Sequence, residues 1–292
     1  MKNATLSRRV LSPVLPSWLA LSLGIAALGL GPRADATAVD SELLFLVDIT
    51  QTGMNNQQFD KLMDSYASAM TSSQVLDSIQ SGATGKIAVS MVFYGGSFTQ
   101  TVAVPWMAIG NATQAQQFAN IVSSLMRPLS LTSPSISAAL NFATTRFGTE
   151  TGNASNGFES AVQVVEVVAA GTDLIPIAGK DQAARNDALA SGVDIINSIA
   201  VGSRTNQVQS YFASNVIGGE VGGVKASSGK SSINNSLDGY LASHFESTVD
   251  GGAQVSQSAV PEPSTSVSVL SAAAILLLRR RRNESTLRSG RA

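Results

Sequence analysis

The sequence has no cysteine, and this absence excludes disulfide bonds, thiolate catalysis and zinc–thiolate sites together. Histidine is almost absent too. The one histidine, His244, has no nucleophile or acid indicated beside it, so a catalytic triad is not predicted. Aromatic residues make up only 5% of the chain, whereas Ser, Thr, Asn, Gln and Gly are plentiful. Without disulfides the chain needs a hydrophobic core, and its polar composition suits a solvated extracellular surface.

Basic residues are scarce between residues 37 and 263, where nine lysines and arginines face eighteen aspartates and glutamates. This segment carries a net charge of −9, although the whole chain carries −1, because the other basic residues lie near the two ends. A phosphate backbone repels so acidic a surface, and we therefore expect no nucleic-acid partner.

The first 36 residues have the three parts of a secretory signal peptide. Lys2, Arg8 and Arg9 supply the positive charge, an apolar run follows at residues 18–30, and Ala34-Asp35-Ala36 gives the small-x-small pattern before a cleavage site. A membrane anchor is the alternative. Thirteen helical residues cover about 20 Å, however, which is less than the roughly 30 Å hydrocarbon core of a bilayer. We therefore expect export.

Residues 261–292 have the pattern of a second targeting segment. Pro261, Glu262 and Pro263 precede a short apolar stretch at residues 267–278, and four arginines follow directly. Cationic groups are costly to translocate, so these arginines should hold their end on the cytoplasmic side. They are Arg279, Arg280, Arg281 and Arg282. The small and polar residues of 247–260 predict a flexible linker before this tail.

Residues 37–246 alternate between apolar runs and amphipathic stretches, which predicts one α/β domain. Continuous apolar runs are typical of strands buried on both faces. Amphipathic helices between them imply a mostly parallel sheet with helices on both faces. The expected strands lie at 43–47, 87–94, 161–170 and 193–201, and the expected helices at 59–70, 111–126, 135–147, 181–191 and 232–245.

Two further segments belong to the edges of the predicted sheet. Residues 98–104 follow a Gly-Gly turn and predict an antiparallel strand that ends at Pro105-Trp106. The Gly-rich residues 216–224 are interpreted either as a weak edge strand or as a loop.

Asp48 ends the first apolar run and begins the most suggestive polar cluster. Ligands of parallel sheets bind at the carboxyl ends of the strands, where Asp48 should lie. Thr50 and Thr52 follow at alternate positions, so a carboxylate and two hydroxyls could converge on a hard cation such as Mg²⁺, Mn²⁺ or Ca²⁺. The alternative is that these residues act only as caps and turn residues.

An extracellular hydrolase is the second functional class, and it would need a convergent acid/base pair. The available carboxylates are Asp48, Glu166, Asp173 and Asp194. Glu166 falls inside one expected strand and Asp194 near the start of another, so the set looks scattered. The sequence therefore predicts no catalytic residue, and an enzyme is the weaker interpretation.

The C-terminal tail resembles the PEP-CTERM sorting signals of bacteria that have an exosortase. The matching parts are Val260-Pro261-Glu262-Pro263-Ser264-Thr265, the apolar stretch and the arginine cluster, in that order. The resemblance implies recognition and cleavage by a membrane exosortase, with the tail in the membrane until then. It also implies an association with exopolysaccharide production and biofilm matrices.

The central region, from about residue 42 to 245, resembles a bacterial domain-of-unknown-function family with a von Willebrand factor A-like fold. The resemblance implies a three-layer, Rossmann-like α/β domain with one antiparallel edge strand. The segments that carry it are Leu46-Val47-Asp48-Ile49-Thr50, Gly85-Lys86-Ile87-Ala88-Val89, Val104-Pro105-Trp106, Ser135-Ile136-Ser137-Ala138-Ala139-Leu140, and Tyr211-Phe212 with Asn215-Val216-Ile217-Gly218-Gly219.

The same resemblance implies a metal-ion-dependent adhesion site, but an incomplete one. Such a site draws on three loops, and the first is kept with threonine in place of serine. Pro134 falls at the second-loop threonine and Ala170 at the third-loop aspartate, so neither position offers a side-chain oxygen. Losing a carboxylate weakens the binding of a hard cation. The candidate ligands are Asp48, Thr50 and Thr52, then Ser133 and Ser135 (with Thr132) beside Pro134, and Asp173 beyond Ala170.

Together these patterns predict an exported binding or adhesion module at the cell surface or in the extracellular matrix. Its expected partners are an exosortase during export and then a surface protein or polysaccharide, with Mg²⁺ or Ca²⁺ as the candidate cation. The alternatives are a structural surface domain with a degenerate, metal-free site, and the hydrolase.

Overall fold

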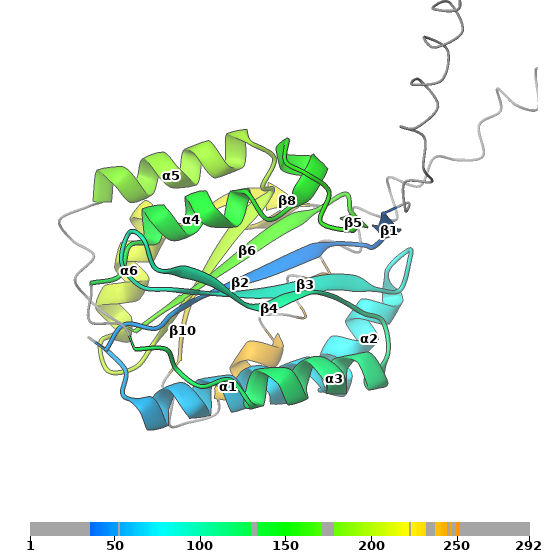
Figure 1. The fold of residues 1–292 in the computed structure, drawn as a ribbon, viewed down its shortest axis with the longest axis horizontal. Helices are drawn as coiled ribbons and strands as arrows, with labels where there is room; N and C mark the ends of the chain where they lie inside the picture. Colours follow the sequence, from blue (N-terminus) through cyan, green and yellow to red (C-terminus); the bar gives the residue numbers. More distant parts are fainter. Residues whose placement is uncertain are drawn as a thin grey trace, which may run out of the picture. The chain divides into compact units, whose positions relative to one another are not determined.

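A computed structural model describes residues 36–51, 53–129, 133–170, 178–221, 223–231, 237–243, 246 and 249–250 (Figure 1). It confirms the predicted α/β class, with a mostly parallel sheet between two layers of helices. The strands are β1 (Thr37–Ala38), β2 (Glu42–Asp48), β3 (Ile87–Tyr94), β4 (Gln100–Ile109), β5 (Phe158–Glu159), β6 (Gln163–Ala169), β7 (Ile195–Val201), β8 (Gly218–Val221), β9 (Val224–Lys225) and β10 (Ser228–Ser231). The helices are α1 (Asn56–Met70), α2 (Ser73–Ser81), α3 (Ala112–Ser123), α4 (Ile136–Thr144), the 3₁₀ turn η1 (Gly148–Thr151), α5 (Ala178–Ala190) and α6 (Thr205–Asn215).

The central sheet has the strand order β4-β3-β2-β6-β7-β8-β9, and β10 also pairs with β7. Strand β2 is parallel to both of its neighbours, β3 and β6, and β6 is parallel to β7. Asp48 is in register with Tyr94, the last residue of β3, and Val47 with Val168 near the end of β6. The carboxyl ends of these strands therefore meet at one edge of the sheet, and Asp48 lies there as predicted.

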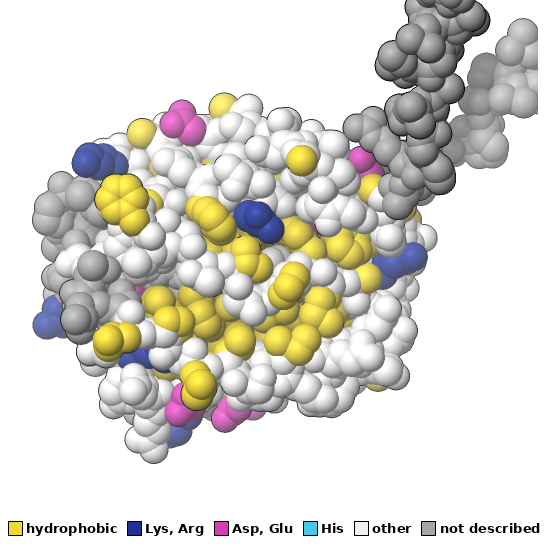
Figure 2. Space-filling model, viewed as in Figure 1, with side chains coloured by type: hydrophobic (Ala, Val, Ile, Leu, Met, Phe, Trp, Pro, Cys, Tyr) yellow, Lys and Arg dark blue, Asp and Glu magenta, His cyan; other side chains and the backbone are white. Residues whose placement is uncertain are grey.

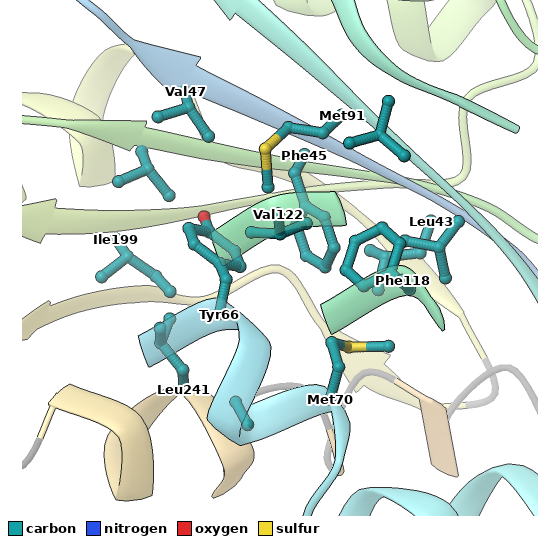
Figure 3. Packing of buried hydrophobic residues seen from close by; sticks show 14 of the residues in the cluster. Leu43, Phe45, Val47, Tyr66, Met70, Met91, Phe118, Val122, Ile199 and Leu241 are labelled. Atoms are coloured by element: carbon teal, nitrogen blue, oxygen red, sulfur yellow. The ribbon is translucent and has the colours of Figure 1, made fainter. Parts of the chain in front are cut away.

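Alternate side chains of β2 build two separate core layers. Leu43, Phe45 and Val47 pack on one face with residues of α1 and α3, and Leu44 and Leu46 pack on the other face with residues of α4, α5 and α6. Figure 1 shows these helices on opposite sides of the sheet. In the first layer the Phe45 ring centroid lies 4.9 Å from that of Tyr66 and 6.4 Å from that of Phe118 (Figure 3). Burial on both faces explains the continuous apolar runs of these strands.

Strand β4 does not end at Pro105-Trp106 as predicted; it continues to Ile109. It is the edge strand, so the N–H that Pro105 lacks costs no ladder bond. Pairing with β3 shifts register twice near this proline, and a bulged, proline-containing edge resists pairing with a further strand. Figure 2 shows hydrophobic side chains gathered on the face that carries β4. Within β4, the half-buried Met107 packs against the first core layer and the half-buried Trp106 against the second.

Two helices and several short strands were not predicted. Helix α2 spans only nine residues, with Val75 and Ile79 as its buried apolar positions, so it is a short signal in sequence. Helix α6 buries only Val208 and Phe212 among its apolar residues, and its periodicity is weak. Residues 218–221 form β8, antiparallel to β7, which adds a second antiparallel pairing to the one expected. Of the expected last helix, residues 237–243 are helical and the other residues lie mostly outside the described part.

Candidate functional site

Asp48 lies at the carboxyl edge of the sheet, where β2 passes into the loop before α1. Its side chain is only 2% exposed, and its Oδ1 accepts a 2.8 Å hydrogen bond from the Thr50 backbone N–H. The other oxygen, Oδ2, is buried and makes no hydrogen bond of good geometry with a described residue, although the Ala170 backbone lies close enough to act on the carboxylate. A buried carboxylate oxygen in this state is energetically costly, which is typical of a functional position rather than a structural one.

Burial raises the pKa of Asp48 to about 6. Two contributions oppose this rise in pKa. The first is hydrogen bonding from Thr50 and from the backbone of Ala170, and the second is the positive charge of Arg127. The carboxylate is therefore mainly ionised at pH 7, in an environment that only partly compensates its charge.

Arg127, which the sequence did not indicate, holds the loop that follows Asp48. Its guanidinium donates to the backbone carbonyl of Ile49 at 2.9 Å, to that of Met54 at 2.7 Å, and to that of Thr50. Burial lowers the pKa of Arg127 and the neighbouring Asp48 charge opposes this fall. The planar guanidinium reaches several carbonyls at once, so it fixes the shape of residues 49–54.

In its described part, the second loop offers the side-chain oxygens of Ser133 and Ser135 only, and the candidate Thr132 lies outside the described residues. Ser133 is exposed, Ser135 is 8% exposed, and Pro134 between them is buried. The Ser135 backbone N–H donates to the carbonyl of Gly95 at 2.8 Å, which ties this loop to the turn after β3. Ser135 is the N-cap residue of α4, but its side chain makes no capping bond.

Asp181 of α5 supplies the missing cap of α4, and nothing in the sequence indicated this role. Its Oδ1 accepts from the Ser137 backbone N–H at 2.9 Å, and its Oδ2 accepts from the Tyr211 hydroxyl at 2.7 Å. The side chain is fully buried, and burial raises its pKa. Both of its oxygens have partners, so Asp181 is a structural carboxylate.

The third loop is only partly described. Ala170 is buried and its backbone lies beside Asp48, so the position at which an aspartate was expected carries a methyl group. The predicted ligands Thr52 and Asp173 lie outside the described residues.

The described residues do not fit a divalent cation. None of them form a group of three or more His, Cys, Asp or Glu side chains able to hold a metal ion. Mg²⁺ and Ca²⁺ need about six or more oxygen ligands, with carboxylates providing most of the affinity. Asp48 is the one carboxylate in the described parts of these loops, and Arg127 already lies near it.

The acidic residues considered for hydrolysis lie at different levels of the sheet. Glu166 pairs with Phe45 in the middle of β2 and is fully buried. Asp194 precedes β7 at the opposite edge, where its carboxylate accepts a 2.8 Å bond from the Gln163 N–H. Six residues of strand, or about 20 Å, separate that edge from Asp48. These three carboxylates form no convergent pair, and Asp173 lies outside the described residues.

The targeting segments also lie outside the described residues, so they stay predictions from sequence. They include the signal peptide at 1–36, Pro261, Glu262 and Pro263, and the arginines Arg279 to Arg282. His244 lies outside as well. None of the helices that the structure describes has the length and apolar character needed to cross a membrane.

Comparison with known families gives one match in sequence. The family model described as "Protein of unknown function (DUF1194)" matches residues 38–238, well over half of the chain. No curated protein matches the chain.

Several solved structures are similar to this chain. Proximal thread matrix protein 1 from the mussel byssus is 12% identical with a TM-score of 0.48, covering 73% of this chain and 49% of its own. This chain thus spans about half the length of the mussel protein, and one structure of that protein has a zinc-occupied MIDAS motif. An aerotolerance-related membrane protein from Bacteroides fragilis is 15% identical (TM-score 0.42; coverage 70% and 98%). A von Willebrand factor type A protein from Catenulispora acidiphila is 10% identical (TM-score 0.43; coverage 74% and 43%).

The layers and strand order described above agree with the predicted α/β architecture, a mostly parallel sheet with helices on both faces. At this identity and these TM-scores, the neighbours carry no inference about what this chain binds.

Proposed function

The chain belongs to the DUF1194 family of proteins of unknown function, and we propose that it is an exported surface module that binds an extracellular protein or polysaccharide. The binding face is the carboxyl edge of the sheet around Asp48. The proposal rests on the fold only for the position of this edge, since parallel α/β sheets bind ligands there.

The proposal depends on one observation. The buried carboxylate of Asp48 has an oxygen without a well-formed hydrogen bond, and the loop that follows it is held in place by the side chain of Arg127. The Arg127 guanidinium binds the carbonyls of Ile49 and Met54. A polar loop held rigid before binding loses little conformational entropy when a partner docks. The buried carboxylate costs folding stability, whereas the ordered loop favours binding of a partner, so we interpret the loop as a recognition site.

Export supports a partner outside the cell. The signal peptide and the PEP-CTERM-like tail are both indicated by sequence, and an exosortase is the expected processing partner. The net charge of −9 between residues 37 and 263 keeps the domain soluble and disfavours nucleic acid. The cell envelope, cell surface or extracellular matrix is therefore the proposed location.

The proposed activity is binding and not catalysis. Asp48, Glu166 and Asp194 lie at three levels of the sheet, so they cannot act on one bond. Pro134 and Ala170 have no side-chain oxygen to ligate a cation, which favours binding without one. The same two residues also fit the second candidate function, a structural surface domain with a degenerate, metal-free site.

A blocking experiment tests the proposed face. Gln51 is exposed in the loop after β2, and Ala83 is exposed before β3 at the opposite edge. Gln51→Trp should weaken binding of the purified full chain to extracellular matrix from the organism that makes it, whereas Ala83→Trp should bind like the wild type. Equal binding by both variants would contradict the proposed face. Turnover of glycan, ester or peptide substrates would contradict the non-enzymatic assignment.

A further inference from the structure

A pocket of about 650 Å³ opens beside the loop that Arg127 holds. It lies between the loop after β2, the start of α1 and the loop before α6, and Gln51, Asn55, Asn56, Arg127, Ser203 and Arg204 are among the residues that line it. Its volume falls within the roughly 300–1,000 Å³ of small-ligand sites.

The charge of the pocket is opposite to that of the surrounding domain. Only nine basic residues occur between residues 37 and 263, against eighteen acidic ones, and four of the nine are arginines. Two of those four, Arg127 and Arg204, line this one pocket, and none of the described residues that line it is an aspartate or glutamate. A local positive potential inside an acidic domain selects an anionic group and directs it to this place.

Arg127 keeps its charge available because the acceptors it contacts are neutral. They are the carbonyls of Ile49, Thr50 and Met54, and the Asn56 side-chain oxygen at 3.5 Å. Asp48 lies near enough to act on its pKa but does not line the pocket. These bonds hold the guanidinium in one orientation and use all but one of its five N–H groups, so Arg127 can donate one charge-assisted bond to a carboxylate.

The start of α1 adds amide groups and a favourable dipole. Asn55 and Gln58 form a capping box, with 2.9 Å bonds in both directions between their side chains and backbone N–H groups. The first turn of α1 holds no acidic residue, so its partial positive charge is not offset within the helix. Exposed Asn56 and Gln57 offer both donors and acceptors, which suit hydroxyl groups.

We propose that this pocket binds an acidic polysaccharide through its carboxylate groups. The two arginines would hold a carboxylate and the surrounding amides the sugar hydroxyls. None of the described residues that line the pocket is aromatic, whereas protein partners are commonly held by aromatic anchors, so a polymer of hydroxyls and carboxylates fits better. This inference rests on the proposed surface-binding function and names its ligand class.

Polygalacturonate is the probe and neutral dextran its control, each titrated against the purified full chain. We expect polygalacturonate to bind, dextran not to bind, and added salt to weaken the interaction. Arg204 is exposed, so Arg204→Gln should keep the fold and lower the affinity about tenfold through loss of a charge-assisted bond. Lys225→Gln removes the same charge from an exposed residue that does not line the pocket, and it should bind like the wild type.

The inference is overturned if polygalacturonate does not bind, if dextran binds equally, or if Arg204→Gln binds as tightly as the wild type. Matrix binding that Gln51→Trp weakens, together with no affinity for polygalacturonate, would reject this ligand class and leave the surface-binding proposal in place. Absence of any matrix binding would reject both.

Discussion

The guanidinium of Arg127 donates a 2.9 Å hydrogen bond to the backbone carbonyl of Ile49, a residue 78 positions earlier in the chain. This bond joins the segment after α3 to the loop that carries the candidate site. A bound cation holds the oxygen atoms of such a loop in fixed positions. Here the Arg127 side chain does part of this by binding the loop carbonyls.

Substitution of Arg127 should destabilise the protein and loosen this loop. Arg127→Gln removes donors from three half-buried carbonyls, and we expect a loss of about 2–4 kcal/mol in the free energy of unfolding. Arg127→Lys should recover only part of it, since an ammonium lacks the planar fork. Urea denaturation measures both. Arg185→Gln, whose guanidinium contacts the adjacent Asn186, should change stability by less than about 0.5 kcal/mol. A similar loss of unfolding free energy in Arg127→Gln and Arg185→Gln would contradict the role of Arg127 in holding this loop.

Asp48 should make the folded protein less stable as the pH rises. Its folded-state pKa of about 6 exceeds the ordinary value of 3.8, so the folded state holds the proton more tightly. The free energy of unfolding should therefore fall between about pH 4 and pH 6 and stay low above that range. Asp48→Asn keeps an acceptor for the Thr50 N–H and should be more stable than the wild type by about 1–3 kcal/mol at pH 8.

The test for Asp48 is the difference between variant and wild type across pH, since other groups titrate in both proteins. That difference should shrink toward zero below about pH 4, where the carboxyl is protonated in both states. A stabilisation that persists unchanged at pH 3.5 would have another origin.

Glu42, at the start of β2, should act in the same direction at higher pH. Burial raises its pKa to about 8, and the nearby Glu150 and Glu159 add to this rise. Glu42→Gln preserves an oxygen for the 2.8 Å bond from the Asn156 side-chain amide. It should raise the free energy of unfolding by about 2–5 kcal/mol at pH 9 and by little at pH 4. Thermal melts at both pH values measure this, and a variant less stable than the wild type at pH 9 would contradict it.

The central strands could be predicted from sequence because they are buried on both faces. Residues 87–94 were predicted as a strand, and β3 has the same bounds. Strand β4 was predicted to stop at Pro105, because nothing in the sequence shows that this proline lies on an edge where its missing N–H costs no bond. Helix α6 was missed because four of its eleven residues are Asn or Gln and only Val208 and Phe212 are buried apolar residues.

The site was predicted only in the part that is local in sequence. Asp48 and Thr50 are two residues apart, so their contact follows from strand and turn geometry. Arg127 and Asp181 reach their partners from residues 78 and 44 positions away, and only the tertiary fold brings them there. No periodicity or spacing within one segment encodes such contacts.

Asp181 and Tyr211 should be energetically coupled through the cap of α4. Asp181→Ala leaves the half-buried Ser137 N–H and the Tyr211 hydroxyl without their acceptor, and we expect a loss of about 2–4 kcal/mol. Asp181→Asn should cost less because it keeps an acceptor. In a double-mutant cycle with Tyr211→Phe, measured by urea denaturation, the coupling energy should be about 1–2 kcal/mol. Additive losses would show that the 2.7 Å contact contributes nothing of its own.

Millimolar Mg²⁺ or Ca²⁺ should leave the melting temperature of the full chain unchanged. Pro134 and Ala170 offer no side-chain oxygen, and the charge of Arg127 already acts on Asp48. A cation bound at 100 times its dissociation constant would add about 2.7 kcal/mol. In a domain of this size such a gain raises the melting temperature by roughly 5–10 °C. Differential scanning fluorimetry at constant ionic strength, with EDTA as the reference, detects a shift of that size easily. A rise that Asp48→Asn abolishes would contradict the metal-free assignment, because Thr52 and Asp173 would then have to complete a cation site that the described residues do not form.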